Sequence, residues 1–137
     1  MHSWKKYRMS TKTFHINGED FDDLQGFYEV VSKHLLPNEN RILGSLDGLN
    51  DALYGGFGAF EDADSVQFIW KNSEKSREDL GFVATKKWLE AKLENPNFNE
   101  KFIQEKLNDL QKGNEKTLFE IILEIFSDHK EIELVLE

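Results

Sequence analysis

The sequence predicts an α/β domain in which a three-stranded parallel sheet is packed with helices. Three short segments have the apolar and β-branched composition of strands, and helical patterns separate them along the chain. Strands that alternate with helices need crossover connections, and such connections place neighbouring strands parallel. With 137 residues, of which 39% are hydrophobic and 31% charged, the chain has the size and composition of one globular domain with one core.

The three predicted strands lie near the start, the middle and the end of the chain. The first falls within TKTFHINGEDF, residues 11–21, where two apolar side chains flank a histidine before an Asn-Gly turn. The second is SVQFIW, residues 65–70, which is rich in β-branched and aromatic residues. The third is EIELVLE, residues 131–137, where apolar and acidic side chains alternate.

Helical spacing of apolar residues marks most of the chain between these strands. A helix over about 22–35 is followed closely by Pro37. SEKSREDLG, residues 73–81, is expected as a short polar helix or turn. KTLFEIILEIFSD, residues 116–128, has the broadest apolar face and is therefore the helix expected to contribute most to the core.

Two further helical patterns, over about 83–93 and 102–110, are separated by Pro96. Together they predict a pair of helices, with Trp88 and Leu107 turned toward the rest of the domain.

LGSLDGLNDALYGG, residues 43–56, predicts a short helix with an acidic flank. Ser45 is a favourable N-cap and Gly55-Gly56 a favourable stop. On a helical wheel one face is apolar and the adjoining arc is polar. The apolar face holds Leu46, Leu49 and Leu53, and the polar arc holds Asp47, Asn50, Asp51 and Tyr54.

A second acidic ridge runs beside the apolar face of the last helix, on Glu120, Glu124 and Asp128. Like charges four residues apart destabilise an isolated helix by a few tenths of a kcal/mol, and neither ridge shows a paired lysine or arginine in the sequence. If the two ridges converge in space, they form a strongly negative patch. If they do not, they are two solvated faces of an acidic protein.

Composition excludes several classes of function. The formal net charge of −9 repels nucleic acid and attracts basic proteins, so no nucleic-acid partner is expected. The sequence contains no run of 18 apolar residues, so no membrane-spanning helix is expected. The lack of cysteine favours the cytoplasm. The chain has no Gly-rich phosphate loop, no GxSxG and no HExxH, and its four histidines are scattered.

The acidic residues also leave open a metal-dependent enzyme. A divalent cation could bind the carboxylates of Asp47, Asp51, Glu124 and Asp128, provided that all four lie within a few ångströms of one another. A further alternative is a general adaptor protein with an acidic surface.

The first ten residues are basic and lack the apolar stretch of a signal peptide. We expect residues 1–10 to be a flexible tail and residues 11–137 to form the single domain. Met9 is a candidate natural start, with the preceding residues an upstream extension, and a genuine ordered tail is the alternative.

Four segments, in this order, resemble the barstar family of intracellular ribonuclease inhibitors. FHINGEDFDDLQGFYEVVSKHLLP is similar to the first strand, turn and helix of that family, and SLDGLNDALYGG to its inhibitory segment. SVQFIWKNSE is similar to the second strand, and LFEIILEIFSDHKEIELVLE to the last helix and strand. The resemblance covers most of residues 13–76 and 117–137, so the segment at about 77–116 is expected to be a helical insertion.

The resemblance implies a function and a set of contact residues. It implies a non-catalytic inhibitor that needs no cofactor, is monomeric when free, and blocks the active site of a basic ribonuclease or nuclease toxin as an immunity protein. Asp51 corresponds to the aspartate that takes the place of a substrate phosphate, and Asp47 to the aspartate that supports it. Glu124 corresponds to an acid that pairs with an arginine of the target, and Asp128 to a more peripheral acid.

Four other residues are expected on the same contact surface. Gly44 and Tyr54 flank the acidic helix. Asn50 and Arg41 depart from the family pattern, because Asn50 replaces an aromatic residue and Arg41 stands near the position of a loop tyrosine. An arginine facing a basic nuclease is unfavourable, so these departures leave the identity of the target open.

Overall fold

The computed structural model describes residues 10–61 and 63–137. The predicted tail therefore lies outside the described residues, except for its last residue, Ser10. The backbone N–H of Ser10 donates to Oδ2 of Asp64 at 2.9 Å, and its carbonyl accepts from the backbone N–H groups of Asp64 and Ser65. Ser10 is thus held against the segment that enters the second strand.

The structure confirms an α/β fold with a three-stranded parallel sheet. Strands β1 (Thr11–Asn17), β2 (Ser65–Lys71) and β3 (Ile132–Leu136) lie in the order β1-β2-β3. The register places Phe14 beside Phe68, and Phe68 beside Leu134. Each strand falls where the sequence predicts it.

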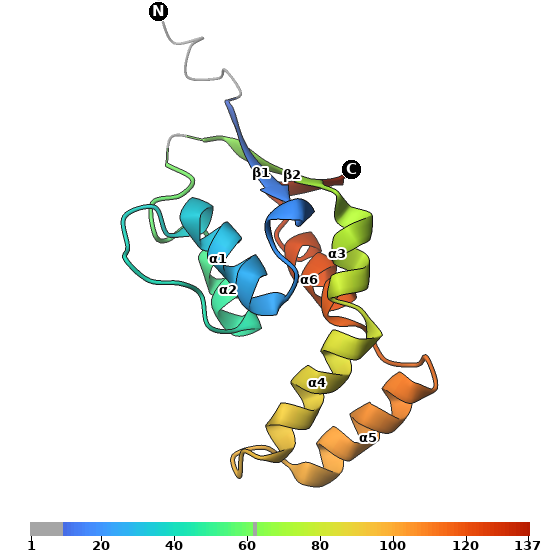
Figure 1. The fold of residues 1–137 in the computed structure, drawn as a ribbon. Helices are drawn as coiled ribbons and strands as arrows, with labels where there is room; N and C mark the ends of the chain where they lie inside the picture. Colours follow the sequence, from blue (N-terminus) through green and yellow to red (C-terminus); the bar gives the residue numbers. More distant parts are fainter. Residues whose placement is uncertain (1–9, 62) are drawn as a thin grey trace, which may run out of the picture.

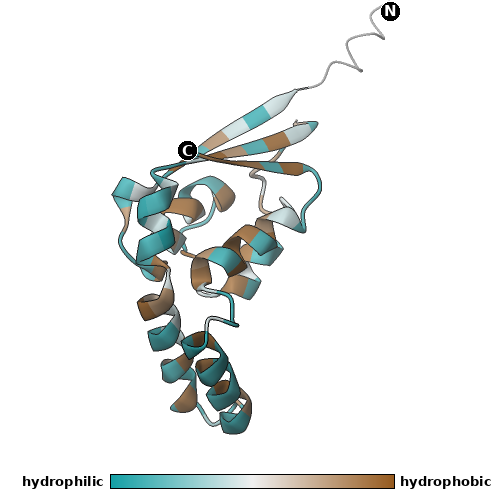
Figure 2. Cartoon of the chain, turned by 90° about the vertical axis from the view of Figure 1, so that its right-hand side faces the viewer, coloured by the Kyte–Doolittle hydropathy of each residue, from teal (hydrophilic) through white to brown (hydrophobic). Residues whose placement is uncertain are grey.

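The helices lie on one side of the sheet (Figures 1 and 2). The face beneath them is apolar, with Phe14, Ile16, Val66, Phe68 and Trp70 all buried. The opposite face carries polar cross-strand contacts, in which the Thr11 and Ser65 hydroxyls lie 2.8 Å apart and Gln67 Nε2 donates to Glu133 at 2.8 Å. This alternation is the period-two pattern that the strand sequences predict.

Two helices cover the buried face and supply the aromatic core. Helix α1 (Leu24–Leu35) stacks Phe27 on Trp70 of the central strand, with ring centroids 5.3 Å apart. Helix α6 (Leu118–Ser127) sets Phe119 edge-on to the same indole at 5.3 Å. Trp70 is fully buried, and its Nε1–H donates to Ser76 Oγ at 3.0 Å, so no polar atom of the ring is left unsatisfied.

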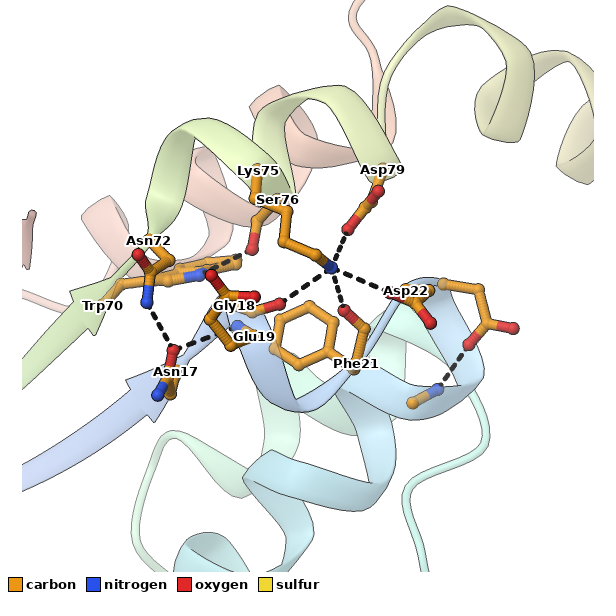
Figure 3. A network of polar contacts seen from close by, with 12 residues as sticks. Asn17, Gly18, Glu19, Phe21, Asp22, Trp70, Asn72, Lys75, Ser76 and Asp79 are labelled. Carbon is orange, nitrogen blue, oxygen red and sulfur yellow. Dashed lines mark hydrogen bonds and ion pairs between the residues drawn. The ribbon is translucent and has the colours of Figure 1, made fainter.

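The turn after β1 is held against helix α3 (Ser73–Asp79) by one ammonium group (Figure 3). Lys75 Nζ donates to the carbonyls of Gly18 and Phe21 at 3.1 and 2.7 Å, and to Asp22 and Asp79 at 2.8 and 2.6 Å. The hydrogen bonds to these two carboxylates raise the pKa of Lys75 above its ordinary value. The short 3-10 helix at this turn (Gly18–Asp20) begins at a glycine because a Cβ there would lie 2.5 Å from the carbonyl oxygen of Asn72.

Helices α4 (Phe82–Leu93) and α5 (Glu100–Gln111) form a hairpin that projects away from the sheet (Figure 1). The hairpin has a small core of its own, made of Leu89, Ile103 and Leu110. Trp88 packs against the main core, as predicted. Leu107 does not, because it packs only against the hairpin core; the apolar stripe of α5 is buried by α4 and not by the rest of the domain.

The expected insertion at about 77–116 begins within α3, which ends at residue 79, and the hairpin itself occupies 82–111. Within the described residues, no helix is both long enough and apolar enough to cross a membrane.

Candidate partner-binding site

Helix α2 (Leu46–Ala52) presents the acidic segment to solvent. Ser45 caps it, accepting from the N–H of Gly48 at 2.9 Å, as the sequence predicts. The apolar face is inside, with Leu49, Ala52 and Leu53 buried, while the side chains on the other arc are outside. Those outer side chains are Asp47, Asp51 and Tyr54, all exposed, with Asn50 half-buried at the boundary.

A buried histidine joins the end of α2 to the end of α6. His129 is only 5% exposed, and its Nε2 lies 2.8 Å from Oδ1 of Asn50. The ring of Tyr54 packs edge-on against the same imidazole, with centroids 4.6 Å apart. Because Asp51 follows Asn50 and Asp128 precedes His129, this contact brings both aspartates to one region, which we call the α2–α6 junction (Asn50, Asp51, Tyr54, Asp128 and His129).

The two aspartates of the junction sit at the negative ends of their helices. Asp51 lies in the last turn of α2, and Asp128 is the C-cap of α6. Neither helix, both fully within the described residues, carries a basic residue in its last turn. An acid at a helix C-terminus costs about 0.3–1 kcal/mol, so local stability does not explain either residue.

An acid near a helix C-terminus does not by itself identify a binding residue, as Asp109 shows. It also lies near the end of its helix, α5, which likewise has no basic residue in its last turn. What distinguishes the junction is that two such helix ends are joined side by side through Asn50 and His129.

Asp47 lies one turn before Asp51, in the first turn of α2, and lines a groove. The groove has a volume of about 510 Å³ and runs between α2, α4 and α6. Gly44 and Asp47 line one side, Ile121 and Ile125 of α6 line it as well, and the hairpin contributes Trp88, Lys92 and Phe98.

Tyr28 also lines this groove, and burial together with the nearby Asp47 charge raises the pKa of Tyr28 to about 12. The Asp47 carboxylate therefore adds negative potential to the groove.

Two of the predicted contact residues are already paired within the chain. Glu124 is exposed but forms an ion pair with Lys116, so the expectation that the α6 ridge has no basic partner is wrong. Arg41 pairs with Glu39 at 2.5 Å, and its guanidinium lies 5.0 Å from the ring centroid of Phe57. Both charges are partly neutralised by neighbours that the sequence pattern does not reveal.

Residues 10–61 and 63–137 contain no group of three or more histidine, aspartate or glutamate side chains placed to hold a metal ion. The four carboxylates Asp47, Asp51, Glu124 and Asp128 therefore do not form the single cation site that the enzymatic alternative requires.

The residue that sequence reasoning missed at this site is His129. It connects two segments 79 residues apart, and nothing in its own sequence context distinguishes a buried histidine from an exposed one. Its position directly after the acidic end of the last helix was the single available signal.

Comparison with protein families, with curated proteins and with solved structures finds no match to this chain.

Proposed function

We propose that the chain is a barstar-like inhibitor, a non-catalytic protein that binds and blocks the active site of a basic ribonuclease in a self-protection role. The proposal draws on the four sequence segments that resemble the family and on the order of elements. In that order a strand, two helices, a second strand, two further helices (α3 and α6) and a third strand follow one another, with the α4–α5 hairpin inserted between α3 and α6.

The observation that carries the proposal is the α2–α6 junction. Asp51 and Asp128 are exposed, lack a basic neighbour in the last turns of their helices, and sit where the helix dipoles disfavour them. Residues that cost local stability are expected where function requires them.

A surface of this kind suits a cationic target. A ribonuclease binds a polyanion, so its active site presents positive side chains where the substrate phosphates lie. In the proposed complex the Asp51 carboxylate occupies a phosphate position and Asp47 supports it from one turn away. Tyr54 is 74% exposed and offers a large, rigid ring beside them, of the kind enriched at interface hot spots.

Two contact side chains are already held in place in the free protein. Asn50 and Tyr54 are fixed by the buried His129, so little conformational freedom remains to be lost at this junction on binding. The excess negative charge of the chain attracts a basic partner at long range and speeds their encounter.

The structure modifies the expected roles of Glu124 and Arg41. Glu124 would exchange Lys116 for a cation of the target, so its net contribution to affinity is expected to be smaller than that of Asp51. Arg41 is compensated by Glu39 within its loop, which lowers the repulsion that a bare arginine would exert on a basic nuclease.

Inhibition of RNA cleavage tests the proposal. The chain is titrated into a fixed amount of a basic, secreted microbial ribonuclease, and the cleavage rate is followed at low and high salt. We expect stoichiometric inhibition that weakens as salt rises, with no requirement for Mg²⁺. A lack of inhibition across a panel of such nucleases would favour the adaptor, whereas cation-dependent turnover by the chain itself would favour the enzyme.

A further inference from the structure

The α4–α5 hairpin differs in charge from the rest of the chain. The hairpin together with the loop that leads to α6, residues 82–116, contains seven lysines and six acids, a net charge of +1, which leaves −10 for the remaining residues. Several of these lysines converge on one cavity, so the hairpin gathers positive charge on an acidic protein.

The cavity lies between α4, α5 and the start of α6 and has a volume of about 160 Å³. This is close to the engineered cavity of about 150 Å³ that holds one benzene ring. Its lining is mainly apolar, formed by Trp88, Leu89, Phe98, Phe102, Ile103 and Ile121. Phe98 and Phe102 are 43% and 53% exposed, so the aromatic lining reaches the surface.

Three lysines line the cavity, and two of them are neutralised. Lys106 pairs with Glu115 at 3.2 Å, and Lys116 pairs with Glu124. Lys92 is different, because in the part of the chain that the structure describes no carboxylate lies within 4.0 Å of its Nζ. Its Nζ lies 3.6 Å from the centroid of the Trp88 ring and 5.2 Å from that of Phe98.

The contrast with Lys75 makes the position of Lys92 informative. The ammonium of Lys75 is surrounded by four oxygen acceptors, whereas that of Lys92 faces two aromatic rings and a cavity. Burial, and secondarily the charge of Lys106, lowers the pKa of Lys92. A partly desolvated cation without a carboxylate partner is stabilised by any anion that can reach it.

We propose that this cavity binds a small organic carboxylate whose apolar body, about the size of one aromatic ring, fills the space among the hairpin side chains and whose carboxylate pairs with Lys92. The apolar lining selects against inorganic anions, and the volume selects against ligands the size of a nucleotide. Lys92, Trp88 and Phe98 also line the groove beside Asp47, whose charge acts on Lys92, but none of these hairpin residues belongs to the α2–α6 junction. The cavity proposal therefore does not require that the chain inhibits a nuclease.

Calorimetric titration with 3-phenylpropionate tests this assignment, with 3-phenylpropan-1-ol and inorganic phosphate as the other ligands. We expect the carboxylate to bind with a dissociation constant on the order of 1 mM or tighter, and the alcohol and phosphate to bind about tenfold more weakly. Lys92→Met should abolish the advantage of the carboxylate over the alcohol, and Lys92→Arg should retain most of it. Lys87→Met, an exposed lysine on the same helix that does not line the cavity, is the matched control and should bind like the parent.

Circular dichroism of each variant confirms that the fold is retained, and the shift of the Trp88 indole N–H resonance on titration locates the ligand. Three results would overturn the assignment: no binding of the carboxylate at millimolar concentration, equal binding of the carboxylate and the alcohol by the parent, or an unchanged carboxylate affinity in Lys92→Met.

Discussion

The α2–α6 junction and the α4–α5 hairpin differ in how their charged side chains are paired and in which core packs beneath them. At the junction, exposed acids stand at the ends of two helices whose last turns carry no basic residue, and the packing beneath them is supplied by the main core. In the hairpin and the loop that follows it, two lysines are paired with acids, two aromatic side chains are partly exposed, and the hairpin packs around a small core of its own.

This difference separates side chains that stabilise the fold from those that are candidates for function. The hairpin side chains mostly improve the local free energy, through burial, ion pairs and lysine–aromatic contacts. The junction aspartates worsen it. Mutations should therefore move stability and binding in different proportions in the two regions.

The largest effect on stability in this comparison is expected from the hairpin core. Leu89 is 1% exposed, and Leu89→Ala should lower the free energy of unfolding of the hairpin by about 2–5 kcal/mol, since it leaves a cavity among Ile103 and Leu110. Urea denaturation and amide exchange of α4 and α5 measure this loss. Ile103→Val, which removes a single methyl group, is the graded control at about 0.5–1.5 kcal/mol.

Inhibition by Leu89→Ala should match the parent under conditions where the main domain stays folded. If the variant loses inhibition as completely as a junction variant does, the two regions are not separable and the hairpin is part of the contact surface.

An alkaline pH dependence is expected from Tyr28, beneath the groove that Asp47 borders. The pKa of Tyr28 is raised from its ordinary value of 10.0 to about 12, so the folded state favours the neutral phenol. The associated stability is fully present below pH 10 and is lost as the pH rises from 10 to 12. Between pH 9 and 11 the parent should therefore lose about 1 kcal/mol that Tyr28→Phe does not lose.

The measurement is denaturant unfolding of both proteins at the two pH values. Lys75, whose pKa is also raised, is present in both proteins and cancels in the comparison. Equal losses in parent and variant would show that the phenol does not stay neutral in the folded state.

The smallest effects on the free energy of unfolding should come from Asp→Asn substitutions, which remove the charge and keep the size of the side chain. Asp51→Asn and Asp128→Asn should each raise stability by about 0.3–1 kcal/mol, because each removes a negative charge from a helix C-terminus. Asp47→Asn should have the opposite sign, since Asp47 lies in the first turn of α2, where the dipole favours it. Thermal unfolding at low salt resolves these signs, and a loss of stability in both Asp51→Asn and Asp128→Asn would mean that these acids support the fold.

Much of this architecture could be predicted from the sequence because it depends on local periodicity. The three strands and the major helices follow from alternating or helical spacing, and the outward direction of Asp47 and Asp51 follows from the leucines on the other face of α2. The cap at Ser45 is equally local, since its side chain accepts from the backbone N–H of Gly48, three residues ahead.

What could not be predicted depends on contacts between distant segments. The pair between Lys116 and Glu124 forms across the start of α6, and the contact between Asn50 and His129 joins two sides of the domain. The prediction that Leu107 faces the rest of the domain is wrong, because a helical stripe indicates that a residue is buried but does not indicate which element buries it. Charge pairing and the partner of a buried face are properties of the tertiary structure.

The central claim is that Asp51 serves binding and not folding, and one paired measurement on Asp51→Ala tests it most directly. Asp109→Ala is the matched control, an exposed aspartate near the end of another helix and on the hairpin. For each variant, denaturant unfolding and inhibition of the target ribonuclease are measured on the same preparation.

Asp51→Ala should change the free energy of unfolding by less than about 0.5–1 kcal/mol, and in the stabilising direction if at all. Its affinity should fall by roughly 2–5 kcal/mol, because the cations of the target are left buried without a partner; complexes of the barstar family are among the cases that define this range. Asp109→Ala should inhibit like the parent. An Asp51→Ala variant that unfolds, or that inhibits as well as Asp109→Ala does, would contradict the account.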